Sequence, residues 1–218
     1  MTKLTGRQIA DAGLTGWVPL ANALHTRVRS GDFATGLALV NAIGAAAEEA
    51  NHHPDIDLRY PHVNIRLFSH DEGGITARDV ELARIISALV ADSGLSQTTH
   101  GVSEMELALD TPNLKALLPF WAAVLAIGPA HSLELGDDLR DGAGTLPLIW
   151  FQESGSEEPR QRWHPDIWVD PAEVQPRIDA AVAAGGTLVS DAEAPSYWVL
   201  ADPEGNKVCL CTWQQRGA

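Results

Sequence analysis

The stretch from residue 32 to residue 70 constrains the fold most, because a helical pattern stops at a proline and a strand pattern follows it. Asp32 can cap the predicted helix, and Pro54 ends it because proline lacks an N–H and clashes with a preceding helical turn. Residues 61–70 then alternate apolar and polar side chains, which predicts a half-buried strand. The apolar stripe of the helix is Phe33, Leu37, Val40, Ile43 and Ala47.

Further elements complete the N-terminal half. Glu72-Gly-Gly74 predicts a turn, and Thr76 offers an N-cap to a second amphipathic helix. Gly16-Trp17 opens a segment that could form strands or a turn and an edge. We therefore expect two helices covering one face of an antiparallel sheet. In the 61–70 strand, one side should carry Val63, Ile65 and Leu67 and the other His62, Asn64, Arg66, Phe68 and His70.

A stretch rich in Ser, Thr and Gly at residues 92–101 divides the chain into predicted domains 1–97 and 98–218. The second domain contains a faint duplication, in which a strand-like segment, a helical segment and short β-like runs occur twice. This repeat predicts paired βαβββ units in a pseudo-symmetric sheet, and so an α+β protein. The segments are 105–110, 114–125, 132–135 and 145–152 in the first copy, and 166–170, 174–184, 188–190, 197–200 and 207–213 in the second.

Charge and composition exclude several partners. The formal net charge is −14 and the pI is about 4.8, whereas a direct nucleic-acid partner requires a basic face. No apolar run is long enough to span a bilayer, and the N-terminus lacks the pattern of a secretion leader. We therefore expect a cytoplasmic protein with no membrane partner. Cys209 and Cys211 should be free, partly buried thiols, because a bridge between such near neighbours needs unusual backbone geometry.

Three histidines, His52, His53 and His70, flank the helix end and the strand. Imidazole donates or accepts protons near neutral pH, so their convergence indicates acid–base chemistry on a small molecule. A purely structural interpretation also exists. Histidines at a helix C-terminus favour the helix dipole, Glu48 can pair with His52 one turn later, and Asp79 fits a capping box. Spacing alone leaves both interpretations open.

A string of motif residues over positions 14–92 resembles the signature of the pterin-4a-carbinolamine dehydratases. The resemblance implies a four-stranded antiparallel sheet with helices on one face, assembling as a homodimer or homotetramer. It also implies dehydration of 4a-hydroxytetrahydropterin to the quinonoid dihydropterin, in pterin recycling and without metal or organic cofactor. The string consists of Glu48, His52-His53-Pro54, Tyr60, His70 and Asp79.

By the same resemblance, His52 and His70 act as acid and base in an order left open, and His53 orients the substrate. Asp79 would hold the loop or His70 in place. The sequence departs from the family pattern at Asp55-Ile56, where an aromatic residue is common, and at Pro61, where a polar one is common; both departures are expected beside the pocket. The implied substrate-binding residues are Glu48, Pro54, Ser69, Asp71, Glu72 and Asp79.

The second half, residues 102–214, resembles the glyoxalase/bleomycin-resistance superfamily, also called the vicinal oxygen chelate proteins. The metal positions of that superfamily correspond here to Ser103, His164 and Cys209. We count one plausible ligand among them, whereas a stable site needs three or four, so no metal is expected. The residues that carry the resemblance are Phe120-Trp121, Trp163 to Asp170 and Ala201 to Cys209.

Two other functions compete with the dehydratase hypothesis. The N-terminal domain could be a non-catalytic, coactivator-like binding module, because proteins that resemble this dehydratase fold also act as dimeric cofactors of other proteins, and the acidic surface would permit such a partner. The C-terminal domain could instead sequester a hydrophobic ligand in a cleft lined by tryptophans. We expect these side chains to line the core or a cleft rather than form a stacking platform; they are Trp121, Trp150, Trp163, Trp168 and Trp198.

Overall fold

The computed structural model describes residues 2–112, 114, 115, 118, 122, 127, 138–142, 144, 146–153, 163–201, 205 and 207–216. The chain divides into two compact units, the first comprising residues 1–103 and 212–218 and the second residues 104–211. Within the described part of the chain, no helix combines the length and the apolar character needed to cross a bilayer.

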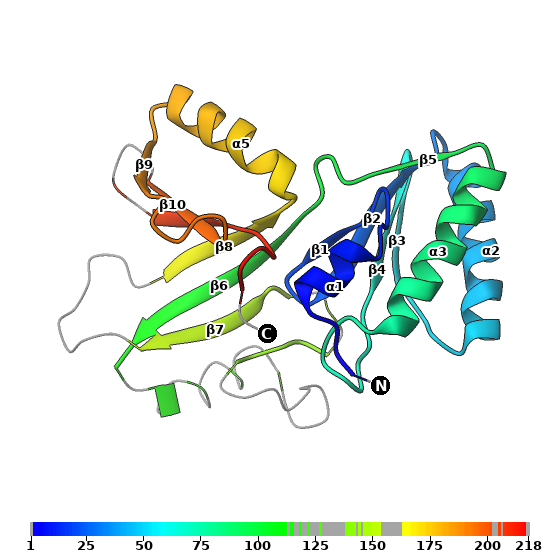
Figure 1. Ribbon diagram of the computed structural model, residues 1–218, viewed down its shortest axis with the longest axis horizontal. Coiled ribbons are helices and arrows are strands. Elements are labelled where there is room, and N and C mark those ends of the chain that lie inside the picture. Colours follow the sequence, from blue (N-terminus) through cyan, green and yellow to red (C-terminus); the bar gives the residue numbers. More distant parts are fainter. Residues whose placement is uncertain are drawn as a thin grey trace. The chain divides into compact units, whose positions relative to one another are not determined.

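Unit 1 is built on an antiparallel sheet. Its helices and strands follow the chain as α1 (Gly6–Asp11), β1 (Val18–Leu20), β2 (Ala23–Arg29), α2 (Phe33–Ala50), β3 (Asp55–Arg59), β4 (His62–Leu67), α3 (Ala77–Asp92) and β5 (Ser96–Thr98). The strand order is β1-β2-β4-β3, and α2 and α3 lie together on one side of the sheet (Figure 1). The predicted antiparallel sheet with helices on one face is confirmed.

The predicted linker at residues 92–101 contains a strand. β5 pairs with Arg27–Arg29 of β2, next to the point where β1 pairs with Ala23–His25. β1 is too short to form hydrogen bonds along the whole edge of β2. β5 supplies hydrogen-bond partners for the backbone groups of β2 that β1 does not reach. The sheet therefore has one strand more than the four that the resemblance implies.

The core lies between the sheet and the helices. Val63, Ile65 and Leu67 of β4 are buried in it, as their alternation predicts. The predicted stripe of α2 is wrong at Phe33 and Leu37, which are 47% and 44% exposed. Spacings of three and four residues fit two neighbouring stripes along the same helix. The buried stripe is the one that contains Gly36, because glycine lets the helix approach the sheet closely. The side that is buried consists of Gly36, Leu39, Ile43 and Ala47.

The C-terminal residues return to unit 1 after the second unit is complete. Trp213 packs against Gly6 in α1, where an added Cβ would lie 3.0 Å from Cε3 of the indole ring. Any larger residue at position 6 would have to displace that ring. Unit 1 is thus assembled from two separate stretches of the chain.

His25 is a buried histidine on β2, directly opposite Arg66 of β4. Burial and the positive charge of Arg66 lower the pKa of His25 to about 3. In the unfolded chain His25 has a pKa near 6.5 and takes up a proton below that pH. In the folded chain the same imidazole does not accept a proton until a much lower pH.

We expect this histidine to make the protein sensitive to acid. Its contribution to stability is fully present above pH 6.5 and is lost as the pH falls from there toward 3, by up to about 1.4 kcal/mol per pH unit. Urea unfolding at a series of pH values should show a shallower decline for His25→Gln than for the wild type. Parallel declines of the two proteins would contradict the assignment.

Unit 2 contains a second sheet, with the strand order β7-β6-β8-β11-β10-β9. Its described elements are β6 (Ser103–Thr111), β7 (Leu148–Glu153), β8 (Trp163–Val169), α5 (Pro171–Ala183), β9 (Thr187–Ser190), β10 (Tyr197–Ala201) and β11 (Lys207–Cys211). α5 begins three residues before the predicted segment 174–184, because Asp170 accepts a hydrogen bond from the Ala172 N–H and proline occupies the first turn. The helix covers one face of the β8–β11 part of the sheet through Val174 and Ile178.

The predicted duplication is visible in strand pairing. β8 and β11 run parallel and enclose α5, β9 and β10 in sequence, which makes one βαβββ unit. β6 and β7 are parallel in the same way, and an antiparallel bridge from Leu139 to Ile149 occupies the place that β10 has beside β11. The paired architecture is confirmed. The segments Phe120-Trp121, 132–135, 202–204 and 206 lie outside the described residues.

Candidate active site

The end of α2 directs two adjacent histidines to different places. Asn51 adopts the left-handed conformation at φ 47°, which asparagine tolerates better than most residues. The His52 N–H then donates to the Ala47 carbonyl at 3.1 Å, and Pro54 prevents the helix from continuing. As a result His52 is only 8% exposed, whereas the side chain of His53 is 56% exposed.

The turn after β4 positions the third histidine. Ser69 and Gly74 form an antiparallel bridge, and Gly73, at φ 65°, provides the left-handed residue that the tight turn between them requires. The predicted turn is therefore confirmed. His70 and Asp71 lie on this turn and reach the same hollow as the end of α2.

A pocket of about 370 Å³ brings the three histidines together. The ring of His70 meets Phe68 edge-on, with the ring centroids 5.1 Å apart. Asn51 and Phe68 are pocket residues that the sequence did not predict, although Phe68 shares a side of the predicted strand with His70. The lining residues are Asn51, His52, His53, Pro54, Asp55, Phe68, His70 and Asp71.

Asp79 is the buried centre behind the pocket, with no exposed surface. Its Oδ1 lies 2.7 Å from Nε2 of His52, and its Oδ2 accepts hydrogen bonds from the Ser69 hydroxyl at 2.6 Å and the Thr76 N–H at 2.7 Å. The capping box is thus confirmed, and the same carboxylate also fixes the loop. Its imidazole partner is His52, and its contact with Ser69 holds the turn on which His70 lies.

Several predicted residues lie elsewhere than in the pocket wall. Ser69 is buried behind the wall with Asp79, so both position other groups rather than face a ligand. Glu72 does not line the pocket. Glu48 pairs with Nε2 of His53 at 3.1 Å, not with His52 as expected, because the turn at Asn51 rotates His52 inward.

Charged groups border the pocket on two sides. Asp55 accepts a hydrogen bond from Arg66 at 2.6 Å, and that guanidinium lies 4.9 Å from the centre of the Phe68 ring. Arg78 donates a hydrogen bond to Asp71 and holds the pKa of the Asp71 carboxyl below its usual range. Asp71 is therefore anionic at neutral pH.

The two departures from the family pattern have different positions. Asp55 lines the pocket, as expected. Pro61 lies instead in the turn between β3 and β4, where its carbonyl accepts hydrogen bonds from the N–H groups of Ser30 and Gly31. The expectation that Pro61 lies beside the pocket is wrong, because β4 carries the chain away from this turn.

Comparisons with known proteins show the family to which the N-terminal residues are similar. Residues 2–89 match the family model described as Pterin 4 alpha carbinolamine dehydratase. A protein of Acidobacterium capsulatum named "Putative pterin-4-alpha-carbinolamine dehydratase" is 41% identical over 92 residues, which are 41% of this chain and 100% of that protein. The chain belongs to the pterin-4a-carbinolamine dehydratase family. A protein of Nocardia farcinica with the same name is 41% identical over 88 residues, 39% of this chain and 93% of its own.

This dehydratase family member carries a second domain. Residues 106–211 match the model of a glyoxalase-like domain, as the sequence predicts. Among solved structures, a transcriptional coactivator/pterin dehydratase from Brucella melitensis is 28% identical, with a TM-score of 0.39, over 40% of this chain and 98% of that one. A glyoxalase/bleomycin resistance protein/dioxygenase superfamily member from Vibrio splendidus is 12% identical, with a TM-score of 0.33, over 50% and 98% of the respective chains.

Three tryptophans of the glyoxalase-like domain contribute to packing, as expected. Trp168 is buried, and its indole N–H donates to Glu106 at 2.6 Å. Trp198 and Trp163 pack against two different apolar clusters. Trp121 lies outside the described residues.

Proposed function

We propose that unit 1 dehydrates 4a-hydroxytetrahydropterin to the quinonoid dihydropterin, the step that returns an oxidised pterin toward reuse. The observation that carries this proposal is the single pocket lined by His52, His53 and His70. Its volume of about 370 Å³ lies within the range of about 300–1,000 Å³ typical of small-molecule sites. Membership of the dehydratase family supports the same reaction class.

The chemistry requires one acid and one base. Hydroxide is a poor leaving group, so an imidazolium must protonate the oxygen on C4a while the C4a–O bond breaks. A neutral imidazole removes the proton from N5 as the C4a=N5 double bond forms, and water leaves. Exchange with solvent then returns both rings to their starting states, so no other reactant is consumed.

The contacts of the two rings suggest which one is the base. Asp79 accepts a hydrogen bond from Nε2–H of His52, which leaves Nδ1 as the nitrogen that can accept a proton. The imidazolium that results is stabilised by the buried carboxylate, as in other carboxylate–histidine pairs. We therefore assign the base to His52 and the acid to His70, which is exposed on its turn.

The remaining wall of the pocket suits substrate binding. Asp71 is anionic and can accept hydrogen bonds from the amino-pyrimidine edge of a pterin. His53 is oriented by Glu48 and can contact the opposite side of the ring system. Phe68 supplies an apolar surface next to His70.

The direct test measures dehydration of chemically generated 4a-hydroxytetrahydropterin by its absorbance change, with and without the purified full-length protein. We expect a rate above that in buffer, in proportion to protein concentration. A rate equal to the buffer rate, from folded protein at several pterin concentrations, would rule out the activity.

A further inference from the structure

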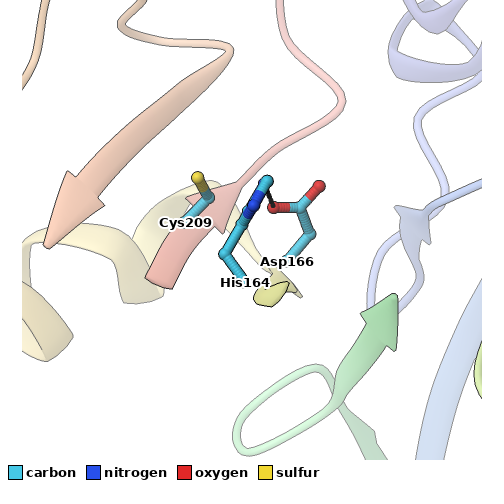
Figure 2. Close-up of side chains that lie close together, drawn as sticks. All are labelled: His164, Asp166 and Cys209. Atoms are coloured by element: carbon cyan, nitrogen blue, oxygen red, sulfur yellow. Dashed lines mark ion pairs between the residues drawn. The ribbon is translucent and has the colours of Figure 1, made fainter. Parts of the chain in front are cut away.

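The sheet of unit 2 brings together three side chains, each of a type that can bind a metal ion. β8 and β11 are parallel neighbours in which Cys209 lies directly opposite Asp166. His164 precedes Asp166 by two residues, so the three side chains leave the same face of the sheet. One donor atom of each lies within 4.8 Å of the others, and Figure 2 shows the imidazole between the thiol and the carboxylate.

We propose that His164, Asp166 and Cys209 bind a divalent transition-metal ion, with Zn²⁺ as the preferred ion. Imidazole, carboxylate and thiolate are the three ligand types that zinc takes from proteins, whereas Mg²⁺ and Ca²⁺ prefer oxygen alone. Three protein ligands leave a fourth position open for water or another small ligand. The donor atoms lie within 4.8 Å of one another, so small side-chain rotations are enough to bring all three into contact with one ion.

The contacts of His164 add independent support. Its Nε2 lies 3.7 Å from Oδ1 of Asp166, on the side of the proposed ion, and its Nδ1 lies 3.9 Å from Oδ1 of Asp110. A metal-binding histidine typically donates its other N–H to a carboxylate, which fixes the ring. The Asp110 oxygen is buried and accepts no hydrogen bond from the described residues, so it is suited to that role.

This donor set differs from the one that the superfamily resemblance implies. Ser103 is exposed at the start of β6 and is not part of the cluster. Two of these donors were not counted from the sequence: Asp166 does not occupy a superfamily ligand position, and Cys209 was discounted although a thiolate binds zinc. The sequence signal was the His-x-Asp spacing, which puts both side chains on one face of a strand.

The experiment uses the full-length protein after removal of metals by a chelator. Titration with Co²⁺, a spectroscopic substitute for zinc, should produce a thiolate-to-metal charge-transfer absorption that saturates at one equivalent and disappears when Zn²⁺ is added. Cys209→Ser should lose this absorption. Cys211→Ser, two residues along the same strand, should keep it.

Calorimetric titration with Zn²⁺ supplies the second readout. His164→Ala and Asp166→Asn should each weaken binding by more than about tenfold, and Asp110→Asn by about tenfold to a hundredfold. Circular dichroism of the metal-free variants establishes that they remain folded. A Co²⁺ spectrum without the thiolate band, a band that survives in Cys209→Ser, or binding lost in His53→Ala or His70→Ala rather than His164→Ala would each overturn the proposal.

Discussion

Replacing His70 with alanine is expected to slow pterin dehydration by about a hundredfold to ten-thousandfold, the usual contribution of a positioned general acid. Without the imidazolium, the oxygen on C4a must leave as hydroxide or take its proton from water. His70 is exposed on a surface turn, so the free energy of unfolding should change by less than about 0.5 kcal/mol. The kcat of the purified variant, beside its urea unfolding curve, measures both effects.

His62→Ala is the matched control for that variant. His62 lies at the start of β4, the strand that leads to His70, but it is not part of the pocket wall. Its removal should leave kcat unchanged. Equal rates for His70→Ala and the wild type, or an equal loss in His62→Ala, would exclude His70 as the acid.

Replacing Asp79 is expected to affect both stability and catalysis. Asp79→Ala removes the acceptor of His52, Ser69 and Thr76 in a fully buried position, which should lower the free energy of unfolding by roughly 3–5 kcal/mol. Asp79→Asn keeps the shape of the side chain but not its charge. We expect its kcat to fall by about a hundredfold, because no anion then stabilises the His52 imidazolium.

Asp92→Ala is the control for stability, because Asp92 is the exposed last residue of the same helix. It should unfold at nearly the same urea concentration as the wild type. An Asp79→Asn protein with wild-type kcat would show that the carboxylate serves only the fold, and the role of His52 as base would then lose its support.

Local signals predicted the elements around the site well. Asp32, Pro54 and the Thr76–Asp79 capping box act through neighbours within a few residues, so the sequence contains their whole effect. β5 was not predicted, because a strand at Ser96–Thr98 depends on the free edge of β2, about seventy residues earlier. The buried stripe of α2 was misjudged for the same kind of reason. Which side of α2 is buried depends on the close approach of Gly36 to β3, and this is a tertiary contact.

The convergence of the three histidines was predicted, but the rest of the pocket wall was predicted only in part, and the hydrogen-bond partners of the histidines were not. The three histidines converge on one pocket, as their placement at a helix end and a strand end suggests. Which partner each one takes depends on the left-handed turn at Asn51, whose effect on side-chain direction is not visible in residue spacing. Because of that turn, Glu48 pairs with His53 instead of the expected His52, and His52 contacts Asp79.

The return of the chain to unit 1 at residue 212 has a consequence for biosynthesis. On the ribosome, the dehydratase unit cannot complete its packing around Trp213 until the whole glyoxalase-like unit has been translated. The match to the dehydratase family ends at residue 89, so the second unit follows the family domain, and the C-terminal residues add a late contact to it. A fragment that stops at residue 103 would contain the whole stretch that matches the family but would lack the contact between Trp213 and Gly6.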